Sequence, residues 1–164
     1  MLQLLWNSKL ASPPCHGDRM NKTHVVIHHS LTADTSTVSW DAIRRYHMEQ
    51  LGWSDIGYHL GIELVGTRYE VLMGRPLDAN GAHCKEARMN IIGLGVCFIG
   101  NFDLAPPPPA MLHEGAKHLS AIMRTLSIPI DRAHVHPHTE FAPYKTCPGT
   151  QFPLDSFIAL LRAS

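Results

Sequence analysis

The chain has no excess of charge of either sign. Fourteen basic residues balance fourteen acidic ones among 164 residues, and 17% of the chain is charged. A surface without a dominant charge does not attract nucleic acid or an anionic membrane over long distances. No apolar run approaches the roughly 20 residues that cross a bilayer, so we expect no membrane insertion. The length and the apolar fraction of 45% instead predict one globular domain.

The chain also lacks paired cysteines. Cys15, Cys84, Cys97 and Cys147 form no CxxC pair and have no regular spacing, which argues against a disulfide framework and against a four-cysteine zinc knot. The first ten residues, MLQLLWNSKL, have too short an apolar stretch and no basic leader for a secretory signal. We therefore expect a protein without a signal peptide, made in the reducing cytoplasm.

The N-terminal third begins irregularly and then becomes periodic. Residues 1–23 have no periodicity and contain PPCHGD, so we interpret them as an irregular leader before a domain of residues 24–164. The β-branched stretch THVVIHHS predicts a buried strand that ends at two histidines. Residues 34–53 combine Ser and Thr caps, apolar residues near helical spacing and a glycine stop, which together predict one helix.

The remaining chain alternates strands and helices and has no internal repeats. We expect, in order, two strands within 57–74 joined at 65–67, a central strand within 90–102, a helix at 110–127, a strand at 132–135 and a last helix at 154–161. The buried stripe expected for the helix at 110–127 consists of Leu112, Ala116, Leu119, Met123 and Leu126. This order predicts an α/β protein with a mixed sheet.

Histidine is the residue that the chain has in excess, with twelve copies. The stretch 134–149, HVHPHTEFAPYKTCPG, holds three histidines, a lysine and a cysteine between prolines. A catalytic zinc takes three protein ligands, commonly His, Cys or a carboxylate, and keeps a fourth position for water. His28 at a strand end, with His138 and Cys147 nine residues apart in this loop, would supply such a set.

Each of these residues also has an ordinary structural interpretation. A lone histidine at the end of a strand is more often a hydrogen-bonded structural residue than a ligand, and a free cysteine is commonly a small buried hydrophobe. Tyr58 would normally pack on a sheet, and Lys145 would normally be a solvated charge. Spacing alone therefore leaves the zinc hypothesis open.

Four stretches carry a resemblance to a known family. VVIHHSLT, GWSDIGYHLGI, GAHCKEARMNIIGLGVCFIGNF and HTEFAPYKTCPG have the order and separations of motifs in the zinc-dependent N-acetylmuramoyl-L-alanine amidases. That family includes amidase-type phage lysozymes and peptidoglycan recognition proteins, and the chain resembles it over about residues 24–152. The resemblance implies a single domain with a central mixed β-sheet flanked by helices, and a peptidoglycan-binding groove with zinc at its floor.

The resemblance also implies roles for seven residues. It assigns one Zn²⁺ per chain to His28, His138 and Cys147, catalytic stabilisation of the oxyanion to Tyr58 and Lys145, and substrate binding in the groove to His83 and Asn90. No HExxH stretch occurs, so a helix-borne glutamate base is not indicated, and Glu140, Tyr58 and a zinc hydroxide all remain candidates for proton transfer.

Two alternatives bear on the metal ligands. His29 directly follows His28 on a strand, where adjacent side chains face opposite ways, so both can hardly bind one ion. His136 is a second-ranked alternative to His138, because using it breaks the alignment with Glu140. The loop from His138 to Cys147 is one residue longer than in the phage-lysozyme pattern, and the family varies at this point.

The implied function is hydrolysis of the amide between N-acetylmuramic acid and L-alanine of the stem peptide. We expect a monomeric phage or prophage endolysin that is made in the cytoplasm and acts on the cell wall after release. The alternative is a recognition module that binds peptidoglycan without cutting it. A role in binding another protein such as a polymerase, known for a few phage relatives, has no support in the motifs or the charge.

Overall fold

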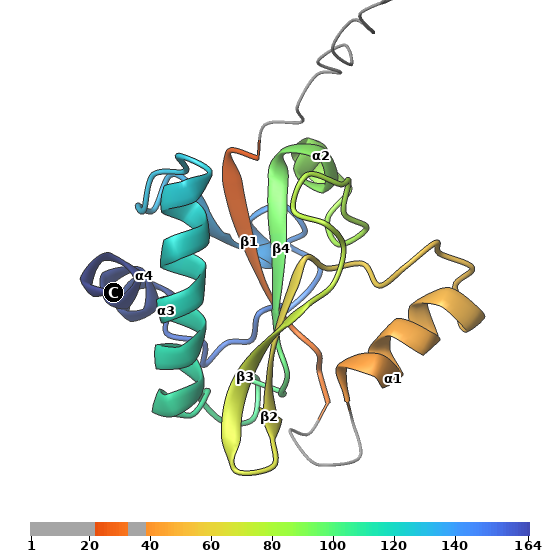
Figure 1. Ribbon diagram of the computed structural model, residues 1–164, viewed down its shortest axis with the longest axis horizontal. Helices are drawn as coiled ribbons and strands as arrows, with labels where there is room; N and C mark the ends of the chain where they lie inside the picture. The colour runs from red at the N-terminus through yellow and green to blue at the C-terminus, as the bar shows by residue number, and fades with distance from the viewer. Residues whose placement is uncertain (1–21, 33–38) are drawn as a thin grey trace, which may run out of the picture.

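The computed structural model describes residues 22–32 and 39–164. Residues 1–21 of the expected leader and residues 34–38 of the expected first helix lie outside the described residues. Figure 1 shows a sheet with helices on both sides. The predicted α/β class, with a mixed sheet flanked by helices, is confirmed.

The sheet has five strands in the order β3-β2-β4-β1-β5. The strands are β1 His24–His29, β2 Leu60–Val65, β3 Arg68–Met73, β4 Gly93–Phe98 and β5 Val135–Pro137. β1 is parallel to both β4 and β5, and β2 is parallel to β4, whereas β2 and β3 form an antiparallel hairpin. Parallel pairing brings the carboxyl ends of β1, β4 and β5 to one edge of the sheet.

Helices lie on both faces of the sheet (Figure 1). α3 Pro109–Thr125 and α4 Leu154–Ala163 pack on one face, and α1 Trp40–Arg45 lies opposite. Short elements complete the described chain: the π-helical turn η1 Tyr46–Gln50, the 3-10 turns η2 Glu86–Arg88 and η3 His138–Glu140, and α2 Met89–Ile92. No helix in the described ranges is long and apolar enough to cross a membrane.

The alternation of side chains along β1 separates the core from the site. Val25 and Ile27 join the main core under α3 and α4, where each fully buried side chain contributes about 1.5–3 kcal/mol. Val26 belongs to a separate cluster on the opposite face, and His28 faces that same side. His29 points back toward the main core, where its Nδ1 accepts the Phe102 amide at 3.2 Å. The two adjacent histidines therefore lie on opposite faces, as the strand periodicity predicts.

The single helix predicted at 34–53 is present in its described part as one uninterrupted helical run over residues 40–50, but its geometry changes along the run. α1 begins at the Ser39 cap, whose hydroxyl accepts the Ala42 amide at 3.2 Å, and gives way to the π-helical turn after Arg45. Tyr46 and Leu51, two of the apolar residues near helical spacing in this stretch, are exposed, and His47 is the buried residue of the π-helical turn. Trp40 is buried instead: its ring lies over Gly61, where an added Cβ would come within 2.4 Å of it.

Two predicted strands have different boundaries. Residues 132–135 are mostly a turn, because the Asp131 carboxylate accepts the Ala133 amide at 2.9 Å and contacts His134 Nδ1 at 2.6 Å. The strand β5 starts only at Val135. The apolar run at 90–102 contains β4 as predicted, but its first residues form α2.

The other predicted elements are confirmed. The hairpin of β2 and β3 turns at residues 66–67, and α3 and α4 match the two C-terminal helices. The buried stripe of α3 is only partly as predicted: Ala116, Leu119 and Met123 are buried, whereas Leu112 and Leu126 are half-buried. The face is rotated toward Met111 and Gly115, which places the Phe98 ring 3.0 Å from a Cβ built on Gly115.

Candidate metal centre and catalytic pocket

Three residues from distant parts of the chain converge at one edge of the sheet. His28 lies in β1, His138 opens η3 directly after β5, and Cys147 lies in the following loop. Their potential ligand atoms all lie within 4.8 Å of one another, and all three residues are buried. Parallel pairing of β1 with β5 explains the convergence, because it places the ends of both strands side by side.

The geometry and chemistry of this group fit zinc. Two ligands bound at about 2.0 and 2.3 Å in a tetrahedron are about 3.5 Å apart, and Cys147 Sγ lies 3.5 Å from His28 Nδ1. The His29 amide donates to Cys147 Sγ at 3.3 Å, which orients the sulfur. His28 Nε2 hydrogen-bonds to His83 Nδ1 at 3.1 Å, which fixes the ring with Nδ1 toward the sulfur.

Burial sets the protonation states of the three groups. It lowers the pKa of His28 well below its usual value, with further lowering by the neighbouring imidazoles of His83 and His138. Burial, followed by the Lys145 charge, lowers the pKa of His138 to about 4. Both imidazoles are therefore neutral at pH 7, the form that binds metal. Burial raises the pKa of Cys147 to about 12, so a cation would have to displace its proton.

Tyr58 lies beside the metal group at the start of the hairpin. Its ring centroid is 5.2 Å from that of His28, and it lines the same pocket as the three candidate ligands. Burial raises the pKa of the Tyr58 phenol well above its usual value, and the thiols of Cys97 and Cys147 add to the shift. At neutral pH the side chain is a phenol that can donate a hydrogen bond.

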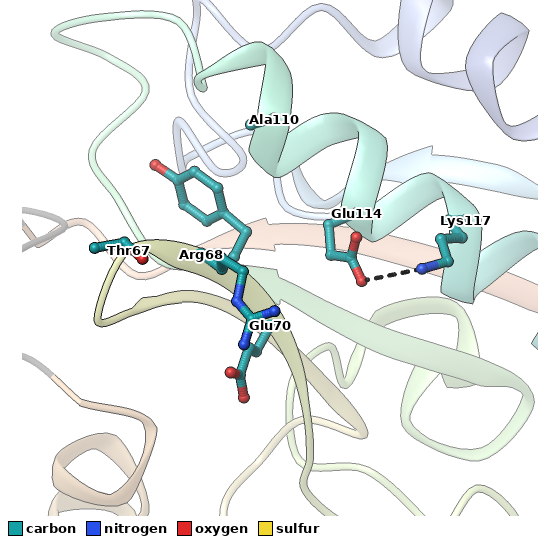
Figure 2. A pocket seen from close by; sticks show the side chains of 7 residues that line it. Thr67, Arg68, Glu70, Ala110, Glu114 and Lys117 are labelled. Atoms are coloured by element: carbon teal, nitrogen blue, oxygen red, sulfur yellow. Dashed lines mark ion pairs between the residues drawn. The ribbon is translucent and has the colours of Figure 1, made fainter.

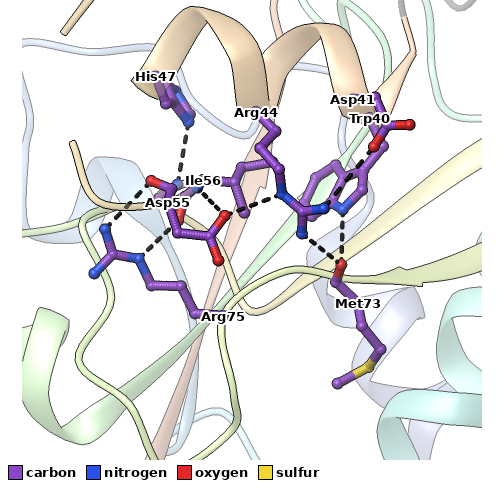
Figure 3. Close-up of polar contacts among 9 residues, drawn as sticks. Trp40, Asp41, Arg44, His47, Asp55, Ile56, Met73 and Arg75 are labelled. Atoms are coloured by element: carbon purple, nitrogen blue, oxygen red, sulfur yellow. Dashed lines mark hydrogen bonds and ion pairs between the residues drawn. The ribbon is translucent and has the colours of Figure 1, made fainter. Parts of the chain in front are cut away.

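The segment before Tyr58 is held by polar contacts from two sides (Figure 3). His47 Nδ1 accepts the Gly57 amide at 3.1 Å, and Arg75 Nε donates to the Ile56 carbonyl at 2.7 Å. Arg44 pairs with the Asp55 carboxylate at 3.0 Å. Because these contacts fix residues 55–57, the position of Tyr58 is set by the fold. No sequence motif predicts these roles of His47 and Arg75.

A pocket of about 510 Å³ opens above the metal group. Its walls include His28, His138 and Cys147 together with Tyr58, Lys145, Trp53 and Tyr144. Lys145 is exposed at the rim, and its amide donates to the Ala142 carbonyl at 2.9 Å in a turn of the loop. The pocket therefore combines a buried set of metal donors with a phenol and an ammonium group.

A pocket of similar size lies elsewhere and carries no such chemistry. It measures about 530 Å³ and lies between the β2–β3 hairpin and α3, where Glu114 and Lys117 form an ion pair at 3.7 Å (Figure 2). No histidine or cysteine is among its described lining residues. Donor chemistry, and not pocket volume, distinguishes the functional site.

Comparison with protein families agrees with this site. The family described as N-acetylmuramoyl-L-alanine amidase matches residues 18–150. The chain belongs to the N-acetylmuramoyl-L-alanine amidase family. The predicted amidase is thereby confirmed.

Phage endolysins are among the relatives of this amidase. It is 34% identical to the endolysin of Klebsiella phage KP32 over 132 residues, which cover 80% of this chain and 83% of the relative. It is 36% identical to the endolysin of Escherichia phage T7 over 130 residues, covering 76% and 79%. Peptidoglycan-recognition protein SC1a of Drosophila melanogaster is 28% identical over 139 residues, covering 78% and 68%. The expected kinship with phage endolysins is confirmed.

Solved structures have the same fold as the amidase. The N-acetylmuramoyl-L-alanine amidase LysC from Clostridium intestinale matches with a TM-score of 0.71 and 27% identity, covering 87% of this chain and 86% of LysC. Wild-type Drosophila PGRP-LB matches with a TM-score of 0.65 and 26% identity, covering 79% and 76%. The match extends over most of each chain.

His83 and Asn90, expected in the substrate groove, are engaged in internal contacts. The His83 ring is buried and bonds to His28, and it lies over Gly95, where a Cβ would come within 2.4 Å. The Asn90 side-chain oxygen accepts the amides of His83 and Cys84 at 2.7 and 2.8 Å. Both residues thus support the metal group, Asn90 through the backbone of His83 and His83 through the ring of His28, and the sequence does not predict this connection. Their contact with substrate stays a prediction.

The structure separates His136 from the metal group. His136 Nδ1 contacts Glu140 Oε1 at 2.9 Å, and Glu140 Oε2 pairs with Arg132 at 2.6 Å. Neither His136 nor Glu140 is among the described residues that line the pocket. His138 is therefore the histidine that lies beside His28 and Cys147.

Proposed function

We propose that this amidase uses one zinc ion, held by His28, His138 and Cys147, to cleave the bond between N-acetylmuramic acid and L-alanine in peptidoglycan. The observation that carries the proposal is the convergence of three buried zinc-type donors at the floor of a pocket. The kinship with phage endolysins and with the amidase LysC supports peptidoglycan as the substrate. The pocket's phenol and ammonium supply the remaining chemistry.

Zinc in such a site polarises a carbonyl and lowers the pKa of a bound water to about 7. The chain's own contribution is to hold the donors in place before substrate arrives. His83 fixes the ring of His28, and the His29 amide orients the sulfur of Cys147. Such outer contacts raise metal affinity and keep the geometry constant.

Tyr58 and Lys145 stabilise the negative charge that develops on the carbonyl oxygen of the scissile amide. The raised pKa of Tyr58 keeps its phenol protonated, so it donates a hydrogen bond and does not act as a base at neutral pH. The Lys145 ammonium adds a positive charge at the pocket rim. Each donor of this kind is worth on the order of 3 kcal/mol in the transition state.

The biological setting that fits is a monomeric endolysin of a phage or prophage, made in the cytoplasm and active on the cell wall after release. The kinship with the KP32 and T7 endolysins supports this setting. A recognition module that binds without cutting is less consistent with the site, because Cys147, Tyr58 and Lys145 are all present.

Cell-wall solubilisation tests the zinc requirement. Purified peptidoglycan labelled with a dye is incubated with the protein after chelation, and one molar equivalent of zinc is then added back. We expect dye release to vanish on chelation and to return with zinc in the wild type, and to stay absent in Cys147→Ser. Cys15→Ser, at a cysteine outside the residues that match the family, serves as the matched cysteine control and should regain release. Full release by the chelated protein would refute the metal mechanism.

A further inference from the structure

A second group of metal-type donors lies on the other side of His138. The potential ligand atoms of Cys84, Glu86 and His138 lie within 4.8 Å of one another. Cys84 and His138 are buried and Glu86 is half-buried. Cys84 Sγ and Glu86 Oε2 are 3.7 Å apart, close to the separation of about 3.5 Å expected for two ligands of one tetrahedral ion.

The loop that carries the two new donors is fixed by its surroundings. The Asn90 side chain accepts the Cys84 amide at 2.8 Å, which holds the base of the loop. The Tyr144 hydroxyl donates to Glu86 Oε1 at 2.9 Å, so one carboxylate oxygen is occupied while the other faces the thiol. The carboxylate is thereby oriented toward Cys84.

We propose that Cys84, Glu86 and His138 form a second binding site for zinc or another thiophilic divalent cation. Thiolate, imidazole and carboxylate are the usual zinc ligands, and the thiol would release its proton to solvent on binding. The thiolate and the carboxylate together would balance the two positive charges of the ion. A pocket of about 410 Å³ is lined by all three residues and gives the cation access from solvent.

An ion at the second site would interfere with the proposed catalytic site. The two groups share His138, so an ion at either one alters the ligand available to the other. Lys145 lines both pockets, and a cation beside Cys84 would repel its ammonium group from the position used in catalysis. This consequence rests on the proposed function, whereas the binding site itself does not. Zinc in excess would therefore inhibit the amidase.

Cobalt binding tests the site directly, because a cobalt–thiolate bond gives an absorption band that reports the sulfur ligand. The full-length apo protein, reduced with a phosphine that leaves the thiols free, is titrated with Co²⁺. We expect Cys147→Ser to retain about one cobalt per chain with a thiolate band. The double variant Cys84→Ala/Cys147→Ser should lose both the bound cobalt and the thiolate band. Adding Glu86→Gln to Cys147→Ser should weaken binding at least tenfold.

Two outcomes would overturn the proposal: a Cys147→Ser protein without a thiolate band, or a band that persists in the double variant Cys84→Ala/Cys147→Ser. Cys97→Ala is the control for a cysteine outside both groups and must keep the bands. The Cys84→Ala single variant reports the proposed catalytic site separately, since its band would come from Cys147. It should keep wild-type activity at one zinc per chain and resist inhibition at excess zinc; inhibition equal to that of the wild type would contradict the opposing role.

Discussion

His28 contacts Cys147 with one ring nitrogen and His83 with the other. Nδ1 lies 3.5 Å from the sulfur, and Nε2 lies 3.1 Å from His83 Nδ1. The ring therefore has one nitrogen for the metal and one for the protein. This arrangement makes His83 a positioning residue for the metal centre, although its own ring is no candidate ligand of the catalytic group.

Replacing His83 should weaken zinc binding without removing a ligand. We expect His83→Ala to lower zinc affinity roughly 10- to 100-fold, the usual cost of losing an outer hydrogen bond to a metal-bound histidine. Competition with a chromophoric chelator measures this affinity. His113→Ala, on the exposed side of α3, is the control. Unchanged affinity in His83→Ala would remove its positioning role.

Lys145→Ala should separate metal binding from catalysis. Because Lys145 lies at the pocket rim and is not one of the three candidate ligands, we expect full zinc occupancy and a fall of roughly 100-fold in kcat/KM. Lys117→Ala, in the pocket of Figure 2, is the matched control and should leave the rate unchanged. A Lys145→Ala protein with the wild-type rate would refute the oxyanion role.

Tyr58→Phe removes only the phenolic oxygen from a ring that is held by fixed backbone. Because residues 55–57 keep their contacts, we expect the fold and zinc binding to persist. The loss of a donor to the oxyanion should lower kcat by roughly 100-fold or more, with a smaller effect on KM. Steady-state kinetics on a soluble muropeptide distinguish the two parameters. A change confined to KM would assign Tyr58 to substrate binding instead.

The stability of the metal-free protein should fall in mild acid. Burial lowers the pKa of His59 to about 4 from an ordinary value of 6.5, so the unfolded chain binds a proton that the folded chain does not. The contribution of His59 to the free energy of unfolding is therefore complete above pH 6.5 and is lost progressively as the pH falls toward 4. The loss from His59 alone is on the order of 3 kcal/mol.

Urea unfolding of the chelated protein at pH 7.5 and pH 5 measures this dependence. His59→Gln should show a smaller loss between the two pH values than the wild type, whatever its stability at pH 7.5. His113→Gln, at an exposed position, should behave as the wild type does. Equal pH dependence in His59→Gln and the wild type would show that another group dominates.

The candidate metal ligands can be predicted from the sequence, whereas most of the contacts that hold them in place cannot. His28, His138 and Cys147 stand in short motifs whose order matches that of the family, so the resemblance points to them without coordinates. The strands β1 to β4 and the helices α3 and α4 also follow from apolar periodicity over six or more residues. These features depend on short motifs and on apolar periodicity within single stretches of the sequence.

The features that the sequence does not predict depend on contacts between distant residues. The bond between His28 and His83 joins positions 55 residues apart, and the Cys84 group needs the packing of two loops. The three-residue strand β5 and the π-helical turn after α1 are too short for a periodic signal. Their boundaries are set by side-chain contacts such as that of Asp131 with His134.

The most direct measurement is mass spectrometry of purified peptidoglycan after incubation with the zinc-loaded protein. A chelated sample and the Cys147→Ser variant are the parallel controls. We expect free stem peptides with a new amino terminus on L-alanine in the zinc sample alone. Binding to the wall without release of such peptides, or the same release by Cys147→Ser, would contradict this expectation.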